Sequence, residues 1–201
     1  MPFMLDNRRC SLSRGAGPGF TLVETMIVVV ISGLMISLAL PRVDTSKYKA
    51  DAVAQIVRTT LQNASRLAIT RQHDIIVSFD TTGERIRTVF DANNDGQITT
   101  GERVTYRGLD VGVLFSDPSV RGVSGSAIHT PVSGAAISLL NGFSTVTFHR
   151  DGSVSSDAEI YVSIAGRGRK LYRAIVLTQA TGRVDWYRLN TETNTWLIAG
   201  L

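Results

Sequence analysis

The residues best suited to bind a ligand form an acidic loop, DANNDGQITTGE, at 91–102. Oxygen-bearing side chains and a glycine occur at the spacing of the calcium loop of an EF-hand. Hard oxygen ligands at alternate positions suit calcium because the chain can wrap around one ion. The candidate ligands are Asp91, Asn93, Asp95, Gln97 through its backbone carbonyl, Thr99 at the ninth position, and Glu102 at the twelfth.

The same residues also fit a loop that holds no metal. The flanking segments TVF and RVTYR have the composition of β-strands, and no helical pattern brackets the loop as in an EF-hand. Asn-Asp-Gly is also a common turn sequence between paired strands. The sequence therefore leaves two alternatives, a calcium site and a metal-free hairpin connection, and calcium is the only cofactor that it indicates.

A second cluster is basic and lies in GRGRKLYR at 166–173. Its basic members are Arg167, Arg169, Lys170 and Arg173. Closely spaced cations can bind phosphates, and the adjacent Tyr172 could stack on a base, so DNA is one candidate partner. The alternative is a solvated hairpin turn balanced by nearby acids. The net charge of the chain is only +4, which does not indicate a global field for nucleic acid.

The residue types that drive catalysis show no organised arrangement. Histidines occur only at 73, 129 and 149, without a Ser-His-Asp order or the spacing of a metal site. A glycine-rich loop that could cradle phosphates is also missing from the sequence. We therefore expect that this chain is not an enzyme.

One carboxylate, Glu24, lies inside an apolar run from Phe20 to Leu40 that is followed by Pro41. At about 1.5 Å rise per residue, a helix of this length spans a bilayer core of about 30 Å. An acidic side chain is costly in lipid and usually has a function. In the first turn of a helix it also lies at the positive end of the helix dipole.

The residues before the apolar run predict its orientation. Residues 1–19 contain Arg8, Arg9 and Arg14, which favours a cytoplasmic leader, a single pass through the inner membrane and a periplasmic C-terminal domain. A secretory signal cut near 37–39 is the alternative. The apolar run is longer than the core of such a signal, which favours a retained membrane helix.

A helical pattern continues beyond Pro41. Apolar residues recur at spacings of three and four as far as about residue 71, which predicts an amphipathic helix. The expected buried stripe is Ala50, Val53, Ala54, Val57, Leu61, Ala64 and Ala68. We expect one long helix from Phe20 to about Arg71, which continues the apolar segment. The buried stripe of its second half should pack on the following domain.

From Asp74 the sequence changes to short β-rich runs separated by Gly, Asn, Asp and Ser. The predicted strands are Ile75–Phe79, Arg85–Phe90, Arg103–Tyr106, Val111–Phe115, Thr145–His149, Ile160–Ile164, Leu171–Thr178, Val184–Leu189 and Thr195–Ile198. The Gly-, Ser- and Pro-rich region 116–142 is expected to be a long loop or an irregular crossing. A long helix packed on antiparallel β-sheet gives an α+β fold.

The segment G-FTLVE at 19–24 resembles the cleavage and methylation site of type IV prepilins and type II secretion pseudopilins. The resemblance implies that a prepilin peptidase cuts between Gly19 and Phe20 and that Phe20 becomes N-methylated. It also implies that Glu24 acts in filament assembly by pairing with the α-amine of Phe20 in a neighbouring subunit. Pro41 matches a proline that is common at the end of the apolar half-helix. The alternative is that Glu24 only lies in the headgroup region.

Later motifs extend the resemblance to the H-type minor pseudopilins and the FimT/FimU minor pilins. They are F-D-x-N at 90–93, F-x-x-D-G-S at 148–153 and V-L-T-Q-A-T-G-R-V at 176–184. The implied organisation is a leader at 1–19, a transmembrane and filament-core helix at 20–41, its amphipathic continuation at 42–72 and a β-rich domain at 73–201.

The resemblance implies a subunit of a type II secretion pseudopilus or a type IV pilus, placed at the filament tip. Its partners would be other pilins or pseudopilins, the prepilin peptidase and the inner-membrane assembly platform. One alternative is a DNA-binding competence pilin, since G-R-x-R occurs at 166–169, although 182–185 reads Gly-Arg-Val-Asp. A membrane-anchored calcium-binding module is the other.

Overall fold

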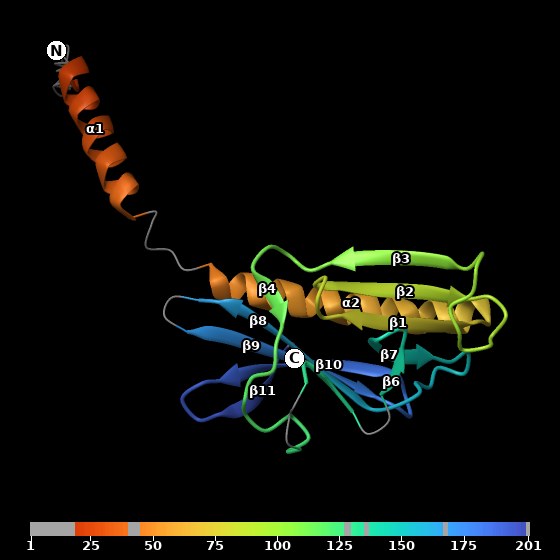
Figure 1. The fold of residues 1–201 in the computed structure, drawn as a ribbon. Helices are drawn as coiled ribbons and strands as arrows, with labels where there is room; N and C mark the ends of the chain where they lie inside the picture. Colours follow the sequence, from red (N-terminus) through yellow and green to blue (C-terminus); the bar gives the residue numbers. More distant parts are fainter. Residues whose placement is uncertain (1–18, 40–44, 127–129, 135–136, 167–168, 200–201) are drawn as a thin grey trace, which may run out of the picture. The chain divides into compact units, whose positions relative to one another are not determined.

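The computed structural model describes residues 19–39, 45–126, 130–134, 137–166 and 169–199 (Figure 1). The chain divides into two compact units, Met1–Val43 and Asp44–Leu201. The leader, with its three arginines, lies outside the described residues, and so does the expected continuity of the helix through Pro41.

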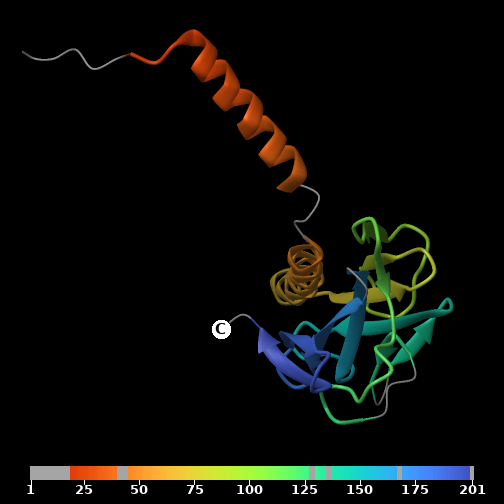
Figure 2. The same cartoon turned by 90° about the vertical axis from the view of Figure 1, so that its left-hand side faces the viewer.

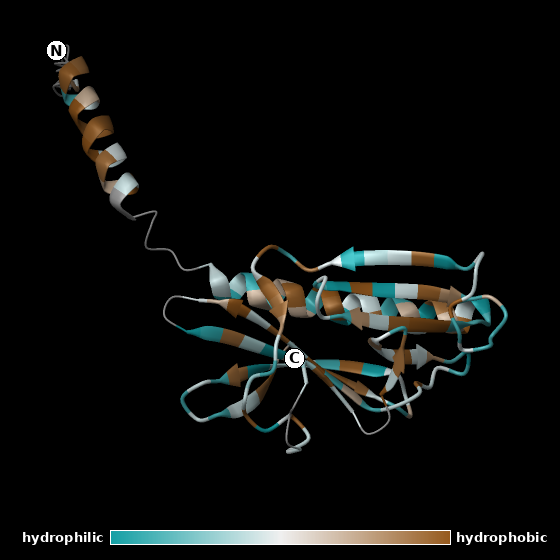
Figure 3. Cartoon of the chain, viewed as in Figure 1, coloured by the Kyte–Doolittle hydropathy of each residue, from teal (hydrophilic) through white to brown (hydrophobic). Residues whose placement is uncertain are grey.

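The first unit contains helix α1, Leu22–Ala39. The helix is apolar along most of its length (Figure 3), and its side chains from 22 to 37 are all exposed. No helix in the described ranges is long and apolar enough to cross a membrane. A helix that is apolar on every side needs an apolar environment, which can be protein or lipid.

The second unit begins with helix α2, Ser46–Arg71. It ends at Gln72, which adopts a left-handed conformation (φ 56°) and donates a side-chain hydrogen bond to the carbonyl oxygen of Ile69 (2.7 Å). The seven residues expected to form the apolar stripe are the seven that the structure buries. The periodic spacing therefore predicted the packing face of this helix correctly.

Two antiparallel sheets follow α2. In the first sheet the strand order is β3-β2-β1-β7-β6, and in the second it is β11-β10-β9-β8-β4, with β5 also paired to β8. The strands are β1 Asp74–Asp80, β2 Arg85–Asp91, β3 Arg103–Gly108, β4 Val113–Phe115, β5 Val132–Ser133, β6 Ser138–Leu140, β7 Phe143–Phe148, β8 Ala158–Ala165, β9 Lys170–Thr178, β10 Arg183–Asn190 and β11 Thr195–Ala199.

Helix α2 lies against both sheets (Figure 2) and contacts β1, β7, β8, β9 and β10. The fully buried Leu61 of the helix shares one core with Phe79 and Phe148 of the first sheet and Ile160 and Ile175 of the second. The predicted α+β class is confirmed. The buried stripe of α2 is the surface that joins the two sheets.

The region 116–142 differs from the prediction of a long loop. It contains β5, β6 and the turn that leads from β6 to β7. Both short strands exist only through pairing, β5 with β8 and β6 with β7. Segments of two or three residues carry too little alternation to be recognised without their partners.

An ionic contact fixes α2 to the second sheet. Asp51, near the start of α2, accepts hydrogen bonds from Arg173 of β9 (2.6 Å) and Arg188 of β10 (2.9 Å). The Arg173 side chain is 5% exposed, whereas that of Arg188 is half exposed. The buried charge of Arg173 therefore depends on the carboxylate of Asp51.

Candidate functional site

The N-terminal segment places its three predicted residues at the start of α1. Gly19 and Phe20 precede the helix, and the Phe20 side chain is 81% exposed. Glu24 lies in the first turn, and its backbone N–H donates to the Thr21 hydroxyl oxygen (3.2 Å). Within the described residues, the Glu24 carboxylate makes no hydrogen bond or ion pair.

Thr21 has a role that the sequence argument missed. Its hydroxyl caps the first turn of α1, and Thr21-Leu22-Val23-Glu24 fits the S/T-x-x-E pattern of a capping box. That pattern was readable from the sequence alone. The carboxylate of Glu24 also lies at the positive end of the helix dipole, where a negative charge stabilises the helix.

The acidic loop connects β2 to β3. The carboxylates of Asp91, Asp95 and Glu102 each offer an oxygen within 4.8 Å of the others. These residues hold the first, fifth and twelfth positions of the predicted calcium loop. Asp91 is fully buried, Glu102 is partly buried and Asp95 is exposed. The fold therefore brings together three of the predicted ligands although the loop lies between strands.

Backbone N–H groups organise this loop. Asp91 accepts from the N–H of Asp95 (3.2 Å) and of Gly96 (2.8 Å), and Glu102 accepts from the N–H of Thr99 (2.9 Å). The other carboxylate oxygen of Glu102, Oε1, is buried and has no hydrogen-bond partner among the described residues. Three carboxylates this close repel one another, and a bound cation would offset that repulsion.

Two of the other predicted ligands, Asn93 and Gln97, make hydrogen bonds to Asp95. The Asn93 side chain donates to Asp95 (2.7 Å), and the Gln97 N–H also donates to the Asp95 carboxylate (2.7 Å). Asn94 ties the loop to β1 by accepting from the N–H of Asp74 (2.8 Å), and Asp74 pairs with His149 (2.8 Å). The hydrogen bond between Asn94 and Asp74 therefore anchors the loop to strand β1 of the first sheet.

The structure separates the members of the basic cluster, of which Arg167 lies outside the described residues. Arg169 is exposed and donates to Thr191 (3.2 Å), and Lys170 is exposed at the start of β9. Arg173 instead points inward, where burial lowers the pKa of its guanidinium although Asp51 favours the charged form. Arg173 therefore does not lie on a common surface with Arg169 and Lys170.

The second G-R segment of the sequence also forms an internal pair. Arg183, at the start of β10, makes an ion pair with Asp185 two residues later (2.8 Å). Both side chains lie on the same face of the strand because they are two positions apart. Asp185 stands where the G-R-x-R pattern has its second arginine, and it therefore neutralises the charge of Arg183.

Residues 18–40 match the family described as the prokaryotic N-terminal methylation motif. The chain has a prepilin-type N-terminus. The match contains Gly19, Phe20 and Glu24, so the resemblance noted for this segment is confirmed. It ends before α2 and leaves the β-rich domain outside.

No curated protein matches the chain. Two solved structures, both of the minor pseudopilin EpsH from the type 2 secretion system of Vibrio cholerae, resemble it. One is 13% identical, with a TM-score of 0.41, and the similarity covers 76% of this chain and 97% of that one. The other is 16% identical, with a TM-score of 0.39, and covers 77% of this chain and 95% of that one.

Proposed function

We propose that this chain is a minor subunit of a pilin-type filament, either an H-type minor pseudopilin of type II secretion or a FimT/FimU-type minor pilin. The observation that carries the proposal is the match of residues 18–40 to the N-terminal methylation motif. The α+β unit behind it, with one helix across two antiparallel sheets, is compatible with this role.

Processing removes residues 1–19 and methylates Phe20. The peptide bond between Gly19 and Phe20 lies ahead of the helix, and apart from its chain neighbours no described residue has a heavy atom within 4 Å of the position that a Gly19 Cβ would take. A protease can therefore reach this bond without unfolding α1. The prepilin peptidase and the other filament subunits are the proposed partners.

Anchoring in the inner membrane precedes assembly, with the β-rich unit on the periplasmic side. Helix α1 has 18 residues and, at about 1.5 Å per residue, accounts for about 27 Å of a bilayer core of about 30 Å. Its exposed apolar side chains then leave lipid for the filament core. The Glu24 carboxylate pairs there with the α-amine of a neighbouring Phe20, and the β-rich unit is displayed at the filament tip.

The test is co-expression of the chain with active or inactivated prepilin peptidase, followed by intact-mass measurement. We expect active peptidase to remove residues 1–19 and add one methyl group to Phe20. Gly19→Val should block cleavage, whereas Gly33→Val, a matched change inside α1, should leave it intact. A chain that stays uncut beside active peptidase, while a known prepilin is processed, would contradict the proposal.

A second candidate function is calcium binding by the β2–β3 loop. The convergence of Asp91, Asp95 and Glu102 within 4.8 Å, together with the buried, unpaired Oε1 atom of Glu102, favours it over a simple turn. Calcium should raise the melting temperature and give heat in a calorimetric titration. The exposed Asp95→Asn should weaken binding about tenfold, and Asp110→Asn on a different loop should not. Absence of both heat and thermal shift would exclude the site.

Binding of DNA by the 166–173 cluster is not part of this proposal. Two described members, Arg169 and Lys170, are exposed, but Arg173 is committed to Asp51. Strong phosphate binding needs several cations on one surface, because each neutralised phosphate adds a share of the affinity.

A further inference from the structure

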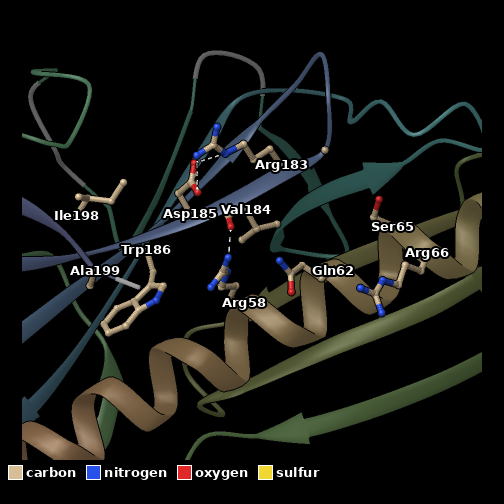
Figure 4. Close-up of a pocket in the computed structure, with 11 residues that line it drawn as sticks. Arg58, Gln62, Ser65, Arg66, Arg183, Val184, Asp185, Trp186, Ile198 and Ala199 are labelled. Carbon is tan, nitrogen blue, oxygen red and sulfur yellow. Dashed lines mark hydrogen bonds and ion pairs between the residues drawn. The ribbon is translucent and has the colours of Figure 1, made fainter. Parts of the chain in front are cut away.

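A groove separates α2 from the outer strands of the second sheet. It has a volume of about 430 Å³, within the range of ligand pockets. Helix α2 supplies Arg58, Gln62 and Arg66 to one wall, and β10 supplies Asp185 and Trp186 to the other (Figure 4). The three helix residues are spaced by four, which places them on one face of the helix.

Two arginines of the groove keep N–H groups that no described residue accepts from. Arg58 uses its Nε to donate to the carbonyl oxygen of Val184 (3.1 Å), which leaves its terminal nitrogens for another partner. Arg66 makes no hydrogen bond or ion pair with any residue that the structure describes. Asp185, which is the one carboxylate among the described lining residues, forms an ion pair with Arg183.

Trp186 is the decisive residue because its polar atom is buried. The side chain is 2% exposed, and its Nε1–H has no acceptor among the described residues. Figure 4 shows the indole nitrogen on the side of the ring that faces Arg58. The guanidinium of Arg188 lies over the ring, 5.2 Å from its centroid, and helps to fix its orientation. A buried donor without an acceptor costs free energy, so an acceptor in the groove would be bound favourably.

The charges of the lining specify the kind of acceptor. Arg58, Arg66 and Arg183 outnumber Asp185, so the groove is positive. Arginine forks match the two oxygens of a carboxylate, and an indole N–H adds a neutral donor to the same group. An Asp or Glu side chain of a bound peptide satisfies both requirements.

Nucleic acid fits the groove less well. Trp186 cannot stack on a base because it is buried and carries Arg188 on its face. The negative charge of Asp185 would also lie close to a phosphate backbone. Three arginines, one of which is already paired with Asp185, are few for binding the successive phosphates of a nucleic-acid strand.

We propose that this groove binds an acidic segment of a protein partner, with one carboxylate held between Arg58 and the Nε1–H of Trp186 and another beside Arg66, about two helical turns along α2. The partner is a neighbouring filament subunit, and only this identity rests on the proposed function. The carboxylate chemistry follows from the groove itself.

Indole N–H resonances of the full-length chain in detergent micelles test the proposal, with acetylated hexaglutamate amide as the probe. The chain has two tryptophans, and the second is an internal control because Trp196 Nε1–H already donates to the carbonyl oxygen of Arg121 (2.8 Å). We expect hexaglutamate to shift the Trp186 indole signal and leave the Trp196 signal in place. Hexaglutamine should shift neither.

Variants separate the groove from general charge effects. Arg66→Gln removes a cation with no described partner and should weaken hexaglutamate binding about tenfold, as for a lost charged hydrogen bond. Arg107→Gln, on the exposed strand β3, removes the same charge from another surface and should leave the affinity unchanged. Equal weakening by both variants would overturn the proposal, as would a Trp186 signal that does not move at millimolar peptide.

A single-stranded oligodeoxynucleotide serves as the competing probe. Tighter binding of this probe than of hexaglutamate would overturn the proposal in favour of nucleic acid. Peptide binding does not require cleavage after Gly19 or entry into a filament. Failure of processing with intact peptide binding would therefore contradict only the proposed function, and the reverse result only the groove.

Discussion

Removal of the Asp51 carboxylate should strongly destabilise the β-rich unit. Asp51 is the counter-charge of Arg173, whose side chain is 5% exposed. In Asp51→Ala the guanidinium stays buried, with the carbonyl oxygen of Tyr172 (2.8 Å) as its remaining described hydrogen-bond partner. Breaking a buried ion pair from one side costs about 3–5 kcal/mol.

The contribution of the second arginine is smaller. The Arg188 side chain is half exposed, so its pairing with Asp51 adds at most about 1 kcal/mol. We therefore expect Asp51→Ala to lower the free energy of unfolding by about 3–5 kcal/mol, which corresponds to a melting temperature lower by about 10 °C for a unit of this size. Asp51→Asn keeps one acceptor oxygen and should cost less, about 2–3 kcal/mol.

The assay is urea unfolding of the full-length chain in mild detergent, followed by fluorescence of Trp186 and Trp196, which both lie in the β-rich unit. Glu192→Gln, an exposed carboxylate change, is the matched control and should alter stability little. The double variant Asp51→Leu with Arg173→Met should recover most of the loss, because it removes both charges together. If Asp51→Ala unfolds at the same urea concentration as the Glu192→Gln control, the ion pair does not stabilise the fold.

Three further predictions concern separate parts of the chain. Hydrogen bonds from the Gly83 N–H and Arg85 hold the pKa of Asp80 below its ordinary value. Asp80→Asn should therefore lower the free energy of unfolding above about pH 4. Urea unfolding should show that the difference from the unmodified chain shrinks as the pH falls through the pKa of Asp80 in the folded state. Glu24→Ala should leave membrane insertion intact, measured by carbonate extraction, but reduce incorporation into filaments; normal incorporation would refute the pairing role. Leu61→Ala should lower the free energy of unfolding by about 2–5 kcal/mol by opening a cavity, and a value under 1 kcal/mol would mean that the core closes around it.

The sequence predicted the elements whose patterns are long. The stripe of α2 was identified residue by residue because each member repeats the helical period against one partner surface. Most strands of the two sheets were placed within a few residues because their β-rich runs are bounded by turn residues. The acidic loop was also found from spacing, and the fold does gather Asp91, Asp95 and Glu102.

Contacts between distant segments could not be predicted in this way. Asp51 and Arg173 are 122 residues apart, and nothing local indicates that they meet. The basic cluster at 166–173 looked continuous in the sequence, but alternation along β9 turns Arg173 inward while Lys170 stays exposed. The groove at Trp186 was missed because it exists only where β10 and α2 approach each other.

Capping by Thr21 and pairing by Glu24 are compatible functions of one helix turn. The Thr21 hydroxyl accepts from the backbone N–H of Glu24, so this donor does not need the carboxylate. The Glu24 side chain is therefore available for a charge outside the helix. Thr21→Val should loosen the first turn and keep the charge, whereas Glu24→Gln should keep the turn and lose the charge. If assembly requires the ion pair, Glu24→Gln should impair incorporation more than Thr21→Val; the opposite order would show that the turn, and not the charge, is what assembly uses.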